Sequence, residues 1–134
     1  MSHLDNETAE TESGQSLAIV AEVLYLANLL LAPGLAFLGL LGLWARHRHS
    51  ASPLARCHLR QTVSASLWAG GLLIVANAVI ILLGGYHRPS TWVVTILYFT
   101  IFHSTLVLLG VLGLARAMAG QPFVYPLIGR RCDE

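Results

Sequence analysis

Residues 44–60 read WARHRHSASPLARCHLR and hold four of the chain's eight arginines, between two long apolar runs. The chain has 134 residues, of which 55% are hydrophobic and only 11% charged. An ordinary soluble domain has roughly 25% charged residues. The composition therefore predicts one small membrane domain, and the basic loop is the element that fixes its direction in the bilayer.

Three apolar runs are predicted to be transmembrane helices, at about 17–45, 61–84 and 91–119. Each is long enough for the roughly 20 residues that a bilayer requires. A soluble bundle is excluded because its helices would need a charged face, which these runs lack. The predicted fold class is all-α and integral to the membrane, with a three-helix domain over residues 17–119.

The first run contains Pro33-Gly34 near its middle, where proline removes a helix hydrogen bond. This pair is predicted to kink or split the helix. Two arms of a hairpin at this point would each be too short to span a bilayer, so we expect one span rather than two.

The two ends of the chain differ from the middle. Residues 1–16 are acidic and almost free of apolar side chains, which predicts a flexible tail. Residues 120–134 contain Pro122 and Pro126, so they are predicted to leave the helix and lie along the membrane surface as an interfacial segment.

Orientation is predicted from the arginines, which are enriched in cytoplasmic loops. Four lie in the 44–60 loop and three at or after the end of the third run, against Arg88 alone on the other side. The loop and the C-terminus are expected in the cytoplasm and the N-terminus outside, in a bacterial inner (plasma) membrane. Cys57 and Cys132 would then both face the reducing cytoplasm, and we expect no disulfide.

Carboxylates are too few in the core for acid–base or two-metal chemistry. Glu22 is the sole acidic residue between Ser13 and Cys132. We therefore expect no catalytic residues and no enzyme activity. Glu22, Asn28 and Asn77 are predicted to form a polar contact between the first two helices in the outer leaflet, as packing contacts or, for Glu22, as a binding point for a partner's arginine.

His103 lies near the middle of the third run, where a polar side chain is a functional hypothesis by default. It is the candidate haem or metal ligand, or proton relay. The alternative is a neutral histidine bonded to a helix carbonyl or a neighbouring hydroxyl. A bis-histidine haem site would need a second histidine at this depth, so we expect no cofactor.

The basic loop contains residue types suited to zinc or copper, but their spacing fits no standard site and the arginines between them would repel a cation. We expect no metal there, and the alternative is a solvated loop facing anionic headgroups. The candidate ligands are His47, His49, Cys57 and His58.

A family resemblance rests on the segments SPLARCHLRQTVSASLW and GLARAMAGQPFVYPLIGRR. The pattern resembles the Tic20-like family of small bacterial membrane proteins over about residues 20–131. The resemblance implies the helical fold and a role in protein translocation or insertion. The matching positions are His58, Arg60, Gln61, Ala117, Gly120, Phe123, Tyr125, Pro126 and Arg130.

Small residues repeat along the helices, which lets another backbone approach closely. We therefore expect a non-catalytic accessory subunit of a larger respiratory or redox membrane complex. The alternatives are a Tic20-like translocation factor and a haem-binding redox subunit. The expected partners are the lipid bilayer and that complex, with no nucleic acid. The predicted partner or lipid contacts are Gly39, Gly42, Arg56, His58, Arg60, Gln61, Tyr125, Pro126 and Arg130.

Overall fold

The computed structural model describes residues 2–50, 52–129 and 131–132, and this part of the chain is helical with no strand. The all-α integral membrane class predicted from the sequence is confirmed. Three helical stretches are long and apolar enough to cross a membrane: Ser2–Leu30, Pro53–Leu82 and Pro89–Met118. The elements are α1 (Ser2–Leu30), α2 (Leu35–His47), α3 (Pro53–Leu82), α4 (Pro89–Leu97), the π-helical turn η1 (Tyr98–His103) and α5 (Ser104–Met118).

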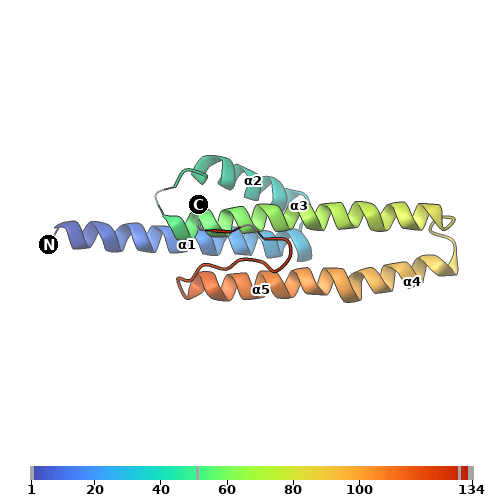
Figure 1. Ribbon diagram of the computed structural model, residues 1–134. Coiled ribbons are helices and arrows are strands. Elements are labelled where there is room, and N and C mark those ends of the chain that lie inside the picture. Colours follow the sequence, from blue (N-terminus) through green and yellow to red (C-terminus); the bar gives the residue numbers. More distant parts are fainter. Residues whose placement is uncertain (1, 51, 130, 133–134) are drawn as a thin grey trace.

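The first apolar run, predicted as one transmembrane helix at about 17–45, is split at Pro33-Gly34 into two helices that form a hairpin (Figure 1). α1 ends at Leu30, and α2 runs back beside it from Leu35. Gly34 adopts φ +87°, a left-handed conformation that glycine accepts without steric cost. The Gly34 N–H donates to Asn28 Oδ1 at 3.0 Å, so the side chain satisfies a backbone group that the turn leaves free. Residues 17–45 are therefore not one continuous helix, although α1 by itself is long and apolar enough to span a membrane.

The hairpin and the rest of the bundle are offset along the axis. α1 ends alongside the middle of α3, and the far halves of α3 and α4 pair without it (Figure 1). At the other end Gln15 Nε2 donates to the carbonyl oxygen of Met118 at 2.8 Å. The start of the apolar part of α1 and the end of α5 therefore lie at the same end of the bundle, whereas the sequence predicted the two termini on opposite sides of the membrane.

Residues 2–16, predicted to be a flexible tail, continue α1 without a break and are helical in this structure. Their side chains are mostly exposed, and hydroxyl groups bond back to carbonyls one turn earlier, as Thr11 does to Glu7 at 2.7 Å. The polar segment therefore extends a helix that the apolar residues after it stabilise by packing.

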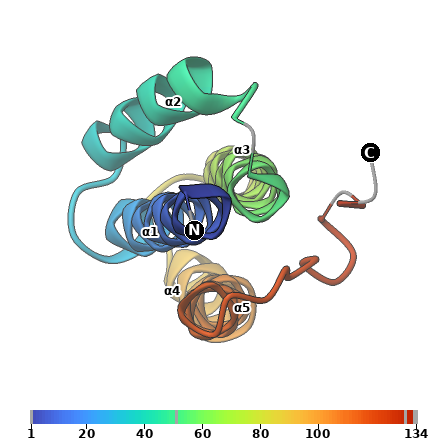
Figure 2. The same ribbon diagram turned by 90° about the vertical axis from the view of Figure 1, so that its left-hand side faces the viewer.

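α1 lies at the centre of the cross-section, with α2, α3 and α5 around it (Figure 2). Two apolar clusters hold these helices together. Ala21, Leu40 and Leu59 join α1, α2 and α3. Tyr25 and Ala65 join α1 and α3 to Tyr125 in the segment after α5.

The C-terminal segment leaves α5 after Met118 and passes along the bundle to α3 (Figure 2). Tyr125 is only 1% exposed, and the Ile128 carbonyl accepts a hydrogen bond from Ser64 Oγ at 3.1 Å. The sequence predicted a segment on the membrane surface, whereas this one contributes to the core. Tyr125 of this segment packs against α1 and α3.

Candidate functional site

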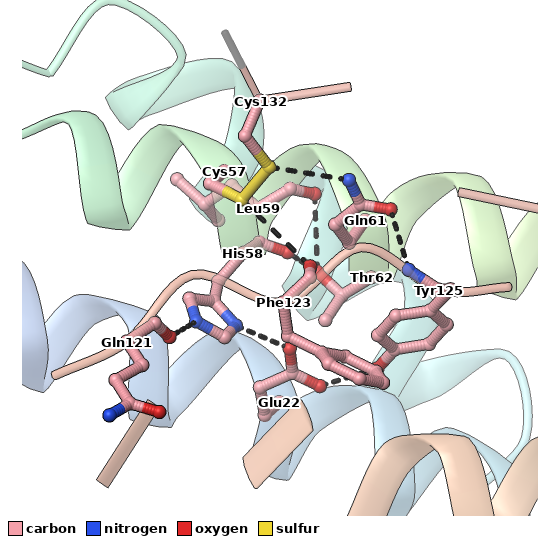
Figure 3. A network of polar contacts seen from close by, with 10 residues as sticks. All are labelled: Glu22, Cys57, His58, Leu59, Gln61, Thr62, Gln121, Phe123, Tyr125 and Cys132. Carbon is pink, nitrogen blue, oxygen red and sulfur yellow. Dashed lines mark hydrogen bonds and ion pairs between the residues drawn. A yellow bond between two sulfur atoms is a disulfide. The ribbon is translucent and has the colours of Figure 1, made fainter. Parts of the chain in front are cut away.

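A buried polar network joins α1, α3 and the C-terminal segment (Figure 3). Glu22 on α1 is at its centre, with Oε1 2.6 Å from His58 Nδ1 on α3. The Tyr125 hydroxyl donates to Glu22 Oε2 at 2.5 Å. Glu22 and His58 have no exposed surface, so both oxygens of the one acidic side chain in the core are engaged away from water.

The hydrogen bonds of His58 fix where its protons are. Nε2 lies 3.0 Å from the Gln121 carbonyl oxygen, which can only accept, so Nε2 carries a proton. The contact between Nδ1 and Glu22 then contains one further proton, carried by the imidazole as an ion pair or by the carboxyl group as a neutral pair. Either arrangement satisfies both groups, and removal of one partner leaves the facing atom of the other, Nδ1 or Oε1, buried without a hydrogen bond.

Local structure makes room for this network. Gly113 on α5 faces the Glu22 carboxylate, and a Cβ atom there would lie 2.6 Å from Oε2. Gly110, one turn earlier, faces the Tyr25 ring in the same way. These two glycines therefore let α5 approach α1 closely, which the small-residue argument predicted for other positions.

Tyr125 is held from both sides. Its backbone N–H donates to Gln61 Oε1 at 3.5 Å, and its ring packs edge-on against Tyr25. Burial, together with the nearby Glu22 carboxylate, raises the pKa of the Tyr125 hydroxyl far above its usual value. The hydroxyl therefore stays protonated and remains a donor to Glu22 throughout the physiological range.

Cys57 and Cys132 form a disulfide that ties the C-terminal segment to α3 (Figure 3). Their Cα atoms are 5.1 Å apart and 75 residues separate them in sequence. The prediction of no disulfide is wrong. It rested on compartment alone, since both cysteines were expected on the reducing cytoplasmic side of the membrane.

The candidate metal ligands of the basic loop have separate partners. Cys57 is in the disulfide, His58 is in the network, and His47 Nδ1 lies 3.1 Å from the Leu43 carbonyl oxygen. His49 lines a cavity beside the loop. Among residues 2–50, 52–129 and 131–132 no group of three or more histidine, cysteine or carboxylate side chains could hold a metal ion.

His103 lies at the end of η1 and packs against the Phe99 ring, with the ring centroids 5.2 Å apart. It lines a largely apolar cavity of about 580 Å³ between the α1–α2 turn, α3 and η1. Ser66, whose buried hydroxyl has no hydrogen-bond partner, lines the same cavity. His103 is the one histidine among the residues that line this cavity, so a bis-histidine site is not formed there.

The predicted partner or lipid contacts divide by exposure. His58, Gln61 and Tyr125 are buried in the core, so they bind other parts of this chain. Arg130 lies outside the described residues. The exposed positions are Gly39, Gly42, Arg56, Arg60 and Pro126.

The predicted contact among Glu22, Asn28 and Asn77 does not form. Asn28 binds the α1–α2 turn, and Asn77 accepts a hydrogen bond from the Tyr86 hydroxyl near the far end of α3. Sequence reasoning paired these residues because it placed all three at a similar depth in the outer half of the membrane. The signal it missed was that a lone carboxylate in an apolar chain needs a cation or donor, and His58 at the start of α3 is one.

The helical fold, the three candidate spans and the internally bonded polar core define a small integral membrane protein. Its family follows from comparison with family models: residues 14–131 match the magnetosome magnetite crystal formation family, MamF/MmsF, and the chain belongs to that family. Searches of the curated proteins and of the solved structures found no match.

This match corrects the family assignment that was based on sequence resemblance. The assignment to the Tic20-like family is wrong, because the matching model covers nearly the same residues and describes a different family. The hypotheses of a respiratory accessory subunit, a translocation factor and a haem-binding redox subunit are overturned with it. The sequence features cited for the resemblance, an arginine-flanked helix and a Tyr-Pro pair after the last helix, are not specific to one family.

Proposed function

We propose that this chain is a magnetosome membrane protein that takes part in the formation of magnetite crystals. The observation that carries the proposal is the family match, which runs from Gly14 to Arg131 and so includes every apolar helix. The family description supports the magnetosome membrane as its location, in place of the plasma membrane that the sequence predicted. The lipid bilayer is its immediate partner, and a larger protein complex stays a prediction.

We propose further that the role is not enzymatic. Glu22 is the acidic residue of the core, and it uses both carboxylate oxygens to hold His58 and Tyr125. A general acid or base must have a position from which to reach a substrate, whereas Glu22 has no exposed surface. The network therefore serves to fix the helices, and the protein acts through its surfaces in the membrane.

Orientation is the third part of the proposal. The arginines gather at the end of the bundle that carries the α2–α3 loop and the C-terminal segment, which favours that end on the cytoplasmic side. Because α1 enters from the same end, the N-terminus belongs on that side as well. The turn between α3 and α4 then faces the magnetosome lumen. In this placement the disulfide lies at the cytoplasmic end, where Cys57 is only 3% exposed and Cys132 is partly exposed, so access of cytoplasmic thiols is restricted at Cys57 alone.

The test is genetic and uses the intact chain. In a magnetite-forming bacterium that lacks its own family member, expression of this protein should change the size or shape distribution of the crystals seen by electron microscopy. A Glu22→Ala variant expressed at the same level is the comparison, since it removes the centre of the core network. Crystals with the same distribution with and without the wild-type chain would reject the proposed function.

A further inference from the structure

A second cavity, of about 580 Å³, lies at the arginine-rich end between the α2–α3 loop and the first turns of α3. Arginine side chains from both elements line it, and none of the described residues that line it is acidic. The lining arginines are Arg48, Arg56 and Arg60.

Two of these three arginines, Arg48 and Arg56, are held in place by their neighbours. The Arg48 guanidinium stacks over the Trp44 ring, 5.5 Å from its centroid, and Arg56 Nη1 donates to the Ser50 carbonyl oxygen at 2.7 Å. Arg60 follows Arg56 by four residues on α3, so both project from the same face of the helix. The disulfide between Cys57 and Cys132 forms one wall.

In the described part of the chain the arginines of the cavity have no carboxylate partner. The ion pair found there is the one between Glu22 and His58. Three guanidinium groups around one concave space repel one another unless an anion lies between them. The start of α3 adds to the positive potential, because the N-terminal end of a helix carries a partial positive charge. The cavity is therefore complementary to an anion.

We propose that this cavity binds a phosphate group. Guanidinium groups match phosphate oxygens in pairs, and three arginines suit an anion with several oxygens better than a halide. Trp44 lines the cavity, and tryptophan is favoured at the membrane–water boundary, the depth of lipid headgroups. The phosphate is supplied by an anionic phospholipid headgroup or by inorganic phosphate in solution.

Binding is measured on the full chain purified in a neutral detergent. Native mass spectrometry records binding of phosphatidylglycerol, with phosphatidylcholine as the zwitterionic comparison, and calorimetry records inorganic phosphate. Arg56→Gln and Arg60→Gln each remove one charge from the cavity, and Arg88→Gln removes one from the opposite end. Retention of the disulfide and of the helical circular dichroism spectrum shows that each variant is folded. If one cavity variant does not fold, the other carries the test.

The wild type and the Arg88 variant should bind equally, and each cavity variant should bind about tenfold or more weakly, as expected for loss of one charge-assisted contact. Selective binding of phosphatidylglycerol identifies the lipid as the source, and binding of inorganic phosphate identifies the free anion. The proposal is overturned if the wild type binds neither ligand. It is also overturned if the folded cavity variants bind as tightly as the wild type.

Discussion

Replacement of Glu22 should destabilise the bundle more than any exposed substitution on the same helix. In Glu22→Ala, the Nδ1 atom of His58 and the hydroxyl of Tyr125 both lose their partner, and both residues are buried. Loss of one partner of a buried charged pair costs about 3–5 kcal/mol, so the free energy of unfolding should fall by this amount. Glu12→Ala, in the exposed first half of α1, should change it by less than about 0.5 kcal/mol.

A second substitution separates hydrogen bonding from charge. In Glu22→Gln the amide group can donate to Nδ1 of a neutral His58 and its carbonyl can accept from Tyr125, so neither group is left unpaired. The cost should be about 1–3 kcal/mol, the difference between charge-assisted and ordinary hydrogen bonds. Unfolding of the detergent-solubilised protein by titration with sodium dodecyl sulfate, followed by circular dichroism, gives the free energies. If Glu22→Ala is as stable as Glu12→Ala, the network does not hold the helices together.

Three further predictions follow from the same contacts. Peptide mapping without reductant should recover Cys57 linked to Cys132. Cys57→Ser should lower the free energy of unfolding by about 4.5 kcal/mol, the chain-entropy value for a loop of this length. No change would mean that the disulfide does not constrain the unfolded chain. Gly113→Ala should lower the free energy of unfolding by about 1–3 kcal/mol, because the added methyl group meets Glu22. Gly42→Ala, where nothing lies within 4 Å, should leave the free energy of unfolding unchanged. Equal effects of the two substitutions would refute the packing of α5 on α1. Because the pKa of Tyr125 is raised, the unfolded chain loses this proton near pH 10 and the folded chain keeps it, so the free energy of unfolding should fall as the pH rises above 10. Between pH 9 and 11 the free energy of unfolding of Tyr125→Phe should fall by about 1 kcal/mol less than that of the wild type. Equal decreases in the two proteins would contradict the buried hydroxyl.

The sequence predicted the helical membrane class because uncharged runs of this length have few other stable environments. It did not predict the hairpin at Pro33-Gly34. Length alone argued against two short arms, but an arm that packs on α3 and turns back within the bundle need not span the bilayer. The side chain of Asn28 accepts the hydrogen bond that closes the turn. The sequence analysis interpreted Asn28 as a contact between helices, because this local role exists only once the turn has formed.

The centre of the site was missed for a related reason. The sequence predicted Glu22 as a contact between helices, His58 as a candidate metal ligand or partner contact, and Tyr125 as a partner contact. The fold brings these three residues together. Glu22, His58 and Tyr125 come together because α1 enters the bundle from the end at which α3 begins. The sequence prediction instead combined the arginine count with three alternating spans, and this placed Glu22 at the opposite face of the membrane. The pairing of Cys57 with Cys132 depends on the same geometry, since the segment that places Tyr125 against Glu22 continues to Cys132 beside α3.

The most direct test of the account is the side of the membrane on which each terminus lies. Epitope tags placed before residue 1 and after residue 134 are probed with a membrane-impermeant reagent, on sealed vesicles and again after the vesicles are opened. Because α1 and α2 form a hairpin, both tags should become reactive under the same condition. Tags that react on opposite sides would show that the first apolar run crosses the membrane once, and would contradict the fold on which the network and the phosphate cavity depend.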